Sequence, residues 1–331
     1  MTRGSLTFKN LAQVALLGVV FGLAGATPSQ AQDYPNRPVR FSVGFVPGTG
    51  ADLQARHVAD KLSQITNQTF LVENKPGALG SLSASLIAKA RPDGYNILSA
   101  SSSLIAANDS LYKGLSYDSL NDLTPIAAFV TTPFVFVVGA DSPIKSIADL
   151  AAHLKTKPNA KFGYSTTTGL IAAEYLKSLA KVSAAQVAYK TASDIFPDVM
   201  SGALDFAATD IPNTLGIARQ GRVRALAVTT TERFKVLPDV PTVDESGFKG
   251  YVFAPWFGFY VPAKTPADVI KKLEGWVNKV MAGDDTRKFF EETGNIPMVE
   301  TGAQTVTRLK KDVQVYRDIT KAAGIEPQAV N

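Results

Sequence analysis

The sequence predicts an α/β fold of two domains with a ligand cleft between them. Short β-branched or aromatic runs alternate with longer amphipathic runs, a pattern typical of mostly parallel sheets flanked by helices. The 331 residues suffice for two domains of ordinary size, and no Pro/Gly/Ser-rich linker divides them. We therefore expect the chain to cross between the domains on extended segments near Pro133 and Phe253.

Each element is predicted from its local pattern. In the first unit, a β-branched run ends at a glycine turn, and Leu53, Val58 and Leu62 then follow at helical spacing. Strands are expected at 39–46, 70–73, 97–100, 134–138, 160–165, 185–189, 206–208, 225–229 and 256–261. Helices are expected at 51–65, 80–90, 147–155, 171–180, 266–281 and 303–323, and the chain after 261 is expected to be almost all helical.

The first 31 residues have the features of a cleaved secretory signal. Arg3 and Lys9 precede an apolar run over 11–24 that is too short to span a bilayer, and small residues follow it. Cleavage is expected after Ala31, or alternatively after Ala26. The alternative is that this apolar run is a membrane anchor, but no second membrane-spanning run follows it in the sequence. We therefore expect a periplasmic protein that is not a lipoprotein, because the chain has no cysteine to acylate.

Composition excludes several function classes. The absence of cysteine rules out disulfides, thiol nucleophiles and cysteine-ligated metals, and His57 and His153 are the only imidazoles. The net charge is +5, and no basic stripe interleaved with aromatic residues suggests nucleic-acid binding. We expect no metal, no cofactor, no nucleic-acid partner and a monomer.

The turn that follows the first strand, Phe45-Val46-Pro47-Gly48-Thr49-Gly50-Ala51-Asp52, is a candidate carboxylate cradle. Its glycines allow a tight turn, and the backbone N–H groups at a helix start favour an anion. The turn is not a dinucleotide fingerprint, because Leu53 stands where the third glycine would be. Glycines also serve merely to join a strand to a helix, and Asp52 is interpreted as a cap or dipole partner.

A second candidate lies between the strand at 160–165 and the following helix. It offers four consecutive hydroxyl residues, Ser165, Thr166, Thr167 and Thr168, which either bind the other side of an anion or only cap the helix. The segment resembles a nucleophile elbow but lacks its closing glycine, so it gives a serine hydrolase little support.

Other candidates have competing interpretations. Both histidines are expected at surface or packing positions. The aromatic cluster at 251–260 is expected to fill the domain junction, with the alternative that one ring faces the cleft and stacks on a ligand. No arginine stands out as a ligand partner, because Arg37, Arg56 and Arg91 all suit surface or capping roles.

In these motifs the chain resembles the extracytoplasmic solute receptors of tripartite tricarboxylate transporters, the Bug-type periplasmic binding proteins. The resemblance begins at Tyr34-Pro35-Asn36-Arg37-Pro38 and extends almost to the C-terminus. It rests on the first turn together with Glu73-Asn74-Lys75-Pro76-Gly77-Ala78-Leu79-Gly80, Pro92-Asp93-Gly94-Tyr95, Tyr189-Lys190, Leu237-Pro238-Asp239-Val240-Pro241-Thr242 and Trp256-Phe257-Gly258.

The resemblance implies a type II Venus flytrap that captures a small carboxylate and delivers it to a membrane permease. Its domains would be 33–132 plus 253–331, and 133–252. The ligand residues carried over are Phe45, Gly48, Thr49, Gly50, Ala51, Ser165, Thr166, Thr167 and Thr168, with Asp210 at the far end of the pocket. The first turn lacks the adjacent glycines usual in the family, and the second loop is shorter, which predicts a different and roomier pocket.

The predicted function is thus a non-enzymatic receptor for an aromatic or aliphatic mono-, di- or tricarboxylate. The alternatives are a periplasmic serine hydrolase and a receptor that signals to a sensor kinase. Asp210 is expected to bind a ligand hydroxyl or amine, or merely to cap the next segment.

Overall fold

The computed structural model describes residues 34–322 and 324–329. The chain divides at Asn36, and Arg37–Asn331 forms one compact unit. The predicted signal segment, residues 1–31, lies outside the described residues. Within the described ranges, no helix combines the length and the apolar character needed to cross a membrane.

The first of two large sheets has six strands in the order β12-β5-β11-β3-β1-β2. Its strands are β1 (Val39–Val43), β2 (Phe70–Asn74), β3 (Asn96–Ser101), β5 (Leu123–Thr131), β11 (Trp256–Pro262) and β12 (Ile296–Thr301). β1 pairs in parallel with β2 and β3, while β11 runs antiparallel to β3 and β5, and β12 antiparallel to β5. This sheet therefore combines an N-terminal parallel half with an antiparallel half that the C-terminal part of the chain completes.

The second sheet has five strands in the order β10-β6-β9-β7-β8. Its strands are β6 (Phe134–Gly139), β7 (Lys161–Tyr164), β8 (Ala185–Ala188), β9 (Phe206–Asp210) and β10 (Val223–Val228). β7 is parallel to β8 and β9, whereas β6 is antiparallel to β9 and β10. A short parallel pair, β4 (Tyr112–Lys113) and β13 (Gln328–Ala329), completes the described strands.

The predicted α/β fold class is confirmed, with one correction to the sheets. They are mixed rather than mostly parallel. The predicted strands β6 and β11 pair antiparallel with their neighbours, and β5 and β12, which were not predicted, add further antiparallel pairs. β12 also corrects the expectation that the chain after 261 is almost all helical. Its alternation is interrupted by a register shift between Pro297 and Glu300, which hides the period-two signal of a strand.

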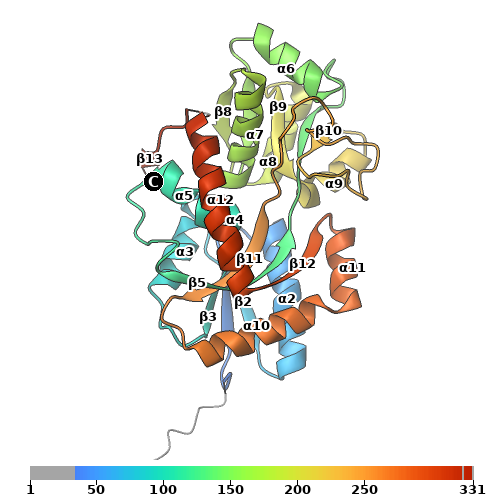
Figure 1. The fold of residues 1–331 in the computed structure, drawn as a ribbon. Helices are drawn as coiled ribbons and strands as arrows, with labels where there is room; N and C mark the ends of the chain where they lie inside the picture. The colour runs from blue at the N-terminus through green and yellow to red at the C-terminus, as the bar shows by residue number, and fades with distance from the viewer. Residues whose placement is uncertain (1–33, 323, 330–331) are drawn as a thin grey trace, which may run out of the picture. The chain divides into compact units, whose positions relative to one another are not determined.

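Helices flank the sheets, as Figure 1 shows. The longer ones are α2 (Gly50–Thr66), α3 (Ser81–Ala88), α6 (Ile147–Thr156), α7 (Thr167–Ala180), α8 (Ala192–Ser201), α9 (Ile211–Arg219), α10 (Ala267–Met281), α11 (Asp284–Glu292) and α12 (Gly302–Ala322). The short ones are η1 (Ala78–Gly80), α4 (Ser102–Ala106) and α5 (Asn108–Leu111). α8 and α9 were not predicted, and both carry prolines that disguise them. α11 lies in the part of the chain that was expected to be almost all helical.

The two sheets are joined by two neighbouring crossing segments. Between β5 and β6, the N–H of Thr132 donates to the carbonyl of Pro255, which precedes β11, at 2.9 Å. The N–H of Phe134 donates to Oγ1 of Thr229 at 3.0 Å, and the N–H of Phe253 to the Thr229 carbonyl at 3.0 Å. The crossings near Pro133 and Phe253 are thus held side by side by backbone hydrogen bonds.

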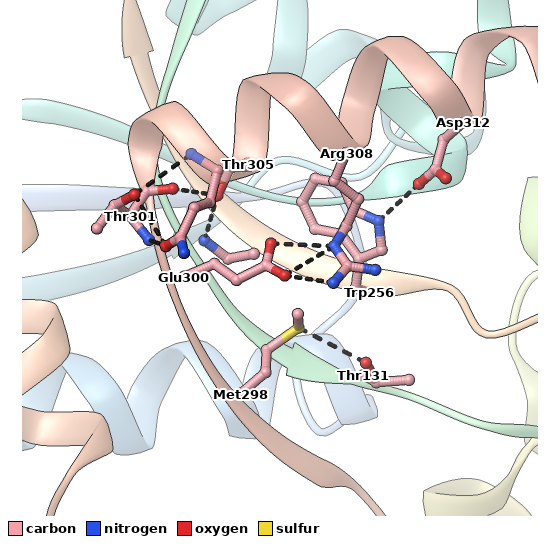
Figure 2. Close-up of polar contacts among 10 residues, drawn as sticks. Thr131, Trp256, Met298, Glu300, Thr301, Thr305, Arg308 and Asp312 are labelled. Atoms are coloured by element: carbon pink, nitrogen blue, oxygen red, sulfur yellow. Dashed lines mark hydrogen bonds and ion pairs between the residues drawn. The ribbon is translucent and has the colours of Figure 1, made fainter.

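The C-terminal helix α12 forms a third link, because it contacts both β5 of the first sheet and α7 beside the second (Figure 1). Figure 2 shows how it is anchored: Nε1 of Trp256, at the start of β11, donates to Asp312 at 2.7 Å, and Arg308 pairs with Glu300 of β12. Oγ of Ser102, on α4, lies 3.0 Å from the Tyr316 hydroxyl. These contacts fix α12 to the start of β11, where the second crossing segment ends, and to β12 and α4.

Candidate functional site

A narrow cavity lies where six strands end. Most residues that line it lie at or after the carboxyl ends of β1, β3, β5, β7, β8 and β9, the edge at which open α/β sheets bind ligands. Its walls come from both sheets and from both crossing segments. Eight of the ten predicted ligand residues line it: Phe45, Thr49, Gly50, Ala51, Ser165, Thr166, Thr168 and Asp210.

The start of α2 faces this cavity with its backbone donors available. Thr49 is the N-cap residue, yet its hydroxyl donates back to the Val46 carbonyl at 3.0 Å, and within the described chain no side chain caps the helix. The first N–H groups of α2, beginning at Gly50, are therefore open to an anion. Gly48 lies outside the cavity lining; its φ of +83° makes the turn, and its N–H donates to Asp52 at 2.9 Å.

Asp52 and Asn74 hold this turn in place. Asp52 is 1% exposed and accepts hydrogen bonds from Gly48, Arg56 and Asn74. Burial alone would raise the pKa of Asp52, but these hydrogen bonds and the Arg56 charge outweigh it and lower the pKa. Asn74 also donates to the Phe45 carbonyl at 2.9 Å. The interpretation of Asp52 as a structural partner rather than a ligand residue agrees with these contacts.

The loop after β2 supports the same turn from behind. The Cα of Gly80 lies so close to Gly44 that a methyl group on Gly44 would approach it to 2.6 Å. Glycine is therefore required at position 44 by this close approach, and at position 80 by a φ of +96°. The resemblance motif that runs from Glu73 to Gly80 consequently builds the turn and does not line the cavity.

The start of α7 forms the opposite wall. Oγ1 of Thr166, the N-cap residue, accepts the Gly169 N–H at 3.1 Å, which leaves the hydroxyl hydrogen free to donate. A methyl group on Gly169 would meet the Ala208 carbonyl at 2.8 Å, so this glycine lets α7 pack closely on β9. Thr167 is 3% exposed and lies outside the cavity lining.

Two further helices begin at the cavity, which the sequence reasoning missed. Thr191 starts α8 with a capping box to Asp194, and Asp210 starts α9 by accepting the Asn213 N–H at 3.0 Å. Thr191, Ala192 and Asn213 all line the cavity. The spacing of Thr191 and Asp194 is a sequence signal for a helix start that was available. Four helices of nine or more residues therefore point their N-termini toward this space.

The charged lining residues are one cation and one carboxylate. Lys190 is exposed and lies two residues after the end of β8. The sequence assigned it no role beyond its place in a motif. Burial raises the pKa of Asp210, although its hydrogen bonds from Asn213 act in the opposite direction. Asp210 caps α9, which is one of the two roles predicted for it; the other was to bind a ligand hydroxyl or amine.

The floor of the cavity is a polar network joined to an aromatic wall. Nε2 of Gln54 donates to Thr132 at 3.1 Å and to Asn295 at 2.9 Å. From the aromatic cluster at 251–260, Phe257 lines the cavity, whereas Tyr251, Phe253, Trp256, Phe259 and Tyr260 are buried. One ring thus faces the ligand space, and the others fill the junction. Gln54 and Thr132 were not predicted.

Neither histidine lines the cavity. His57, in α2, stacks on Phe289 with ring centroids 4.0 Å apart and shares a hydrogen bond with Thr286 at 3.1 Å. His153, in α6, lies 2.7 Å from Asp205. Ser165 therefore has no imidazole beside it in the cavity lining.

Comparisons with known proteins agree on one family. The model of the tripartite tricarboxylate transporter family receptor matches residues 54–325. A UPF0065 protein of Bordetella bronchiseptica is 31% identical over 96% of this chain and 95% of its own length. Protein BugT of Bordetella pertussis is 28% identical over 94% of this chain and 97% of its own.

Solved structures share the fold. Rpa4515 of R. palustris, solved with adipate, has a TM-score of 0.85 and 29% identity, covering 89% of this chain and all of that one. The periplasmic binding protein BugD has a TM-score of 0.82 and 29% identity, over the same shares. The likeness to both therefore extends over most of this chain.

Proposed function

The chain belongs to the tripartite tricarboxylate transporter receptor family, and on that basis we propose how it binds its ligand. It is a periplasmic solute-binding receptor for a small carboxylate. The ligand's carboxylate lies between the starts of α2 and α7, contacting the first N–H groups of α2 and the hydroxyls of Ser165, Thr166 and Thr168. The uncapped start of α2 carries this proposal, because it leaves backbone N–H donors facing the cavity.

Oriented backbone donors suit this task. Helix N-termini stabilise an anion by roughly 0.3–1 kcal/mol each at exposed sites and by up to about 2 kcal/mol when partly buried. The two termini that face the ligand's carboxylate, those of α2 and α7, bind it without a buried cation, whose desolvation would be costly. Lys190 then remains available at the cavity for a second carboxylate of a di- or tricarboxylate.

The size of the cavity favours a small ligand. The space open to the centre of a water molecule is about 50 Å³. A water needs about 10–15 Å³ of such space, so the cavity holds roughly three to five water-sized groups. A short-chain acid fits, and Phe45, Phe134 and Phe257 supply its apolar contacts.

Closure of two domains about the crossing segments is the proposed means of capture. The domains are 33–132 with 253–331, and 133–252, and the hinges lie near Pro133 and Phe253. Residues of both contribute to the cavity, so a bound ligand contacts both domains only when they are closed. A ligand drives closure through this difference in contacts between the two states.

The receptor acts before a membrane permease and not as an enzyme. We propose that residues 1–31 are removed during export, that the receptor is a monomer, and that it delivers its ligand to the permease of a tripartite tricarboxylate transporter. A serine-directed phosphonate is expected to leave Ser165 unlabelled, since no imidazole lies in the cavity lining to activate it. Labelling of Ser165, read by mass spectrometry, would favour the hydrolase instead.

The first experiment is a thermal-shift screen against aliphatic and aromatic carboxylates, amino acids and sugars. A ligand at about a hundred times its Kd adds roughly 2.7 kcal/mol to stability and raises the melting temperature. A response confined to carboxylate-bearing compounds is expected. A response to sugars alone would contradict the proposed carboxylate site.

Variants then test the two helix starts. The double variant Thr49→Ala/Thr166→Ala is expected to weaken carboxylate binding about tenfold or more, because hydrogen bonds to charged groups contribute roughly 1.5–3 kcal/mol. Thr166 should account for most of the loss, since the Thr49 hydroxyl already donates to Val46. Thr166→Ser should retain affinity in calorimetry.

The matched control is Ser146→Ala, which removes the N-cap of α6 outside the cavity. Loss of this cap should lower the stability by about 1 kcal/mol, as loss of a cap does elsewhere, and should leave ligand contacts unchanged. Unchanged affinity in the double variant would show that the site is wrongly assigned.

A further inference from the structure

Asp210 directly faces the helix start that is proposed to hold the ligand's carboxylate. A methyl group placed on Cα of Gly50 would lie 3.8 Å from Oδ1 of Asp210 and 3.6 Å from Cβ of Pro212. The start of α9 and the start of α2 are therefore neighbours at the edge of the cavity. A carboxylate bound at α2 would have the Asp210 carboxylate as a near neighbour, and two like charges repel.

No cationic side chain pairs with Asp210 within the described part of the chain. Its three hydrogen bonds all come from Asn213: two are accepted by Oδ1 and one by Oδ2, at 2.8–3.0 Å. None of the ion pairs among the described residues includes Asp210. A carboxylate has about four acceptor positions, so Oδ2 retains a free one.

A second acceptor, on a residue that lines the same cavity, lacks a donor. Gln54 is 2% exposed, and its Oε1 has no hydrogen-bond partner among the described residues. The orientation of this amide is set by its partners, because Nε2 faces Oδ1 of Asn295, and a flipped amide would bring two oxygens together. An unsatisfied buried acceptor is costly, so a donor is expected from a bound molecule.

From these positions we propose that the ligand is a carboxylate with a hydrogen-bond donor, a hydroxyl or an ammonium group, on the carbon next to the carboxylate. This inference rests on the proposed function, because it places the carboxylate at α2. The donor must lie close to the carboxylate, because Asp210 opposes the first residue of α2. Asp210 accepts this donor, and Gln54 is the second acceptor available within the cavity.

The proposal predicts discrimination against plain acids. A site built to pair with a donor rejects an analogue that lacks it, because the acceptors of the site then stay unpaired. The plain acid also brings its negative charge to Asp210 without compensation. We therefore expect the substituted acids to bind about ten- to a hundredfold more tightly than their plain counterparts.

Isothermal titration calorimetry of the intact protein with two matched series tests this. The series are propanoate, lactate and alanine, and succinate, malate and aspartate; comparing the hydroxyl with the ammonium member identifies the donor. In at least one series a substituted member should bind at least about tenfold more tightly than the plain acid. Equal affinity of the plain acids would overturn this inference and leave the proposed function standing. Absence of binding by every carboxylate would overturn both.

Asp210→Asn tests the assigned residue. Asparagine is as good an N-cap as aspartate, so α9 should be retained. Its amide offers a donor in place of one acceptor, and the preference for substituted acids should fall to less than about threefold. Asp149→Asn, in the first turn of α6 and away from the cavity, is the control that should keep the full preference. A full preference in Asp210→Asn would overturn the assignment.

Discussion

The starts of α2 and α9 lie at the same cavity, each after a strand of its sheet, and their backbone N–H donors have opposite fates. At α2 the N-cap hydroxyl of Thr49 turns back to Val46, and the helix N-terminus stays open. At α9 the N-cap carboxylate of Asp210 takes the Asn213 N–H, and the N-terminus is closed. A helix start thus becomes a donor or an acceptor site according to one side chain.

The largest expected effect comes from closing the gap between these two helix starts. Gly50→Val places two methyl groups where Pro212 and Asp210 already lie 3.6–3.8 Å from the position of Cβ. Overpacking costs about 1–3 kcal/mol, which corresponds to roughly a tenfold to hundredfold loss of carboxylate affinity in calorimetry.

The control for this prediction is Gly275→Ala in α10. Nothing lies within 4 Å of the added methyl group, so this variant should gain about 0.5–1 kcal/mol of stability from helix propensity. Its ligand affinity should equal that of the parent protein. If Gly50→Val bound ligand normally, the two helix starts would not jointly form the site.

A smaller effect is expected from removing the support behind α2. Asn74→Ala leaves the Phe45 carbonyl without its side-chain donor and removes one of the two partners of Oδ1 of Asp52, the other being Arg56. Unsatisfied buried groups cost about 1–3 kcal/mol, so the melting temperature should fall by several degrees and carboxylate affinity should fall with it.

Gln64→Ala is the comparison for Asn74→Ala. Gln64, on α2, also donates to a carboxylate through its side-chain amide, but its bond to Asp60 is exposed. Its loss should change stability by less than about 0.5 kcal/mol. Equal effects of the two substitutions would contradict the role given to Asn74.

The smallest effect concerns pH and the middle of α2. Burial lowers the pKa of His57 below its ordinary value of 6.5, and the nearby Lys61 charge acts in the same direction. The folded state therefore prefers neutral imidazole. Stability from this preference is complete above about pH 6.5 and is lost as the pH falls from there toward the lowered pKa of the folded state.

The change is best measured as melting temperature between pH 7 and 5. His57→Phe preserves a ring against Phe289 and should remove about 1–2 °C of the acid-induced decrease. An identical pH profile in this variant would show that His57 does not contribute. The preference for substituted acids, which depends on the starts of α2 and α9, should be unchanged.

Local patterns explain which parts were predictable. The strand β1, the turn at 44–50 and the helix α2 are contiguous, so glycine spacing and helical periodicity reveal them together. β5 was missed because it is buried along almost its whole length and contains Pro125, and so shows neither alternation nor an uninterrupted β-branched run. α8 and α9 carry Pro197 and Pro212, which obscure a helix although Pro212 stands at its first turn.

The floor of the cavity was beyond sequence reasoning for a different reason. Gln54 and Asn295 are 241 positions apart, and nothing local to either residue indicates the other. Asp210 was predicted to lie in the pocket and does line it, whereas its contact with Gly50 depends on how two helices approach each other. Long-range pairings of this kind follow from the fold, not from spacing.

The bond between Trp256 and Asp312 gives the protein an optical reporter of its own. The chain has two tryptophans, Trp256 and Trp276. The indole of Trp256 stands at the end of the second crossing segment and is 1% exposed, while Trp276 lies on α10. Fluorescence emission from a Trp276→Phe variant therefore comes from a single buried indole beside a carboxylate. The wavelength of that emission reports any rearrangement of the crossing segment in real time, without an attached dye.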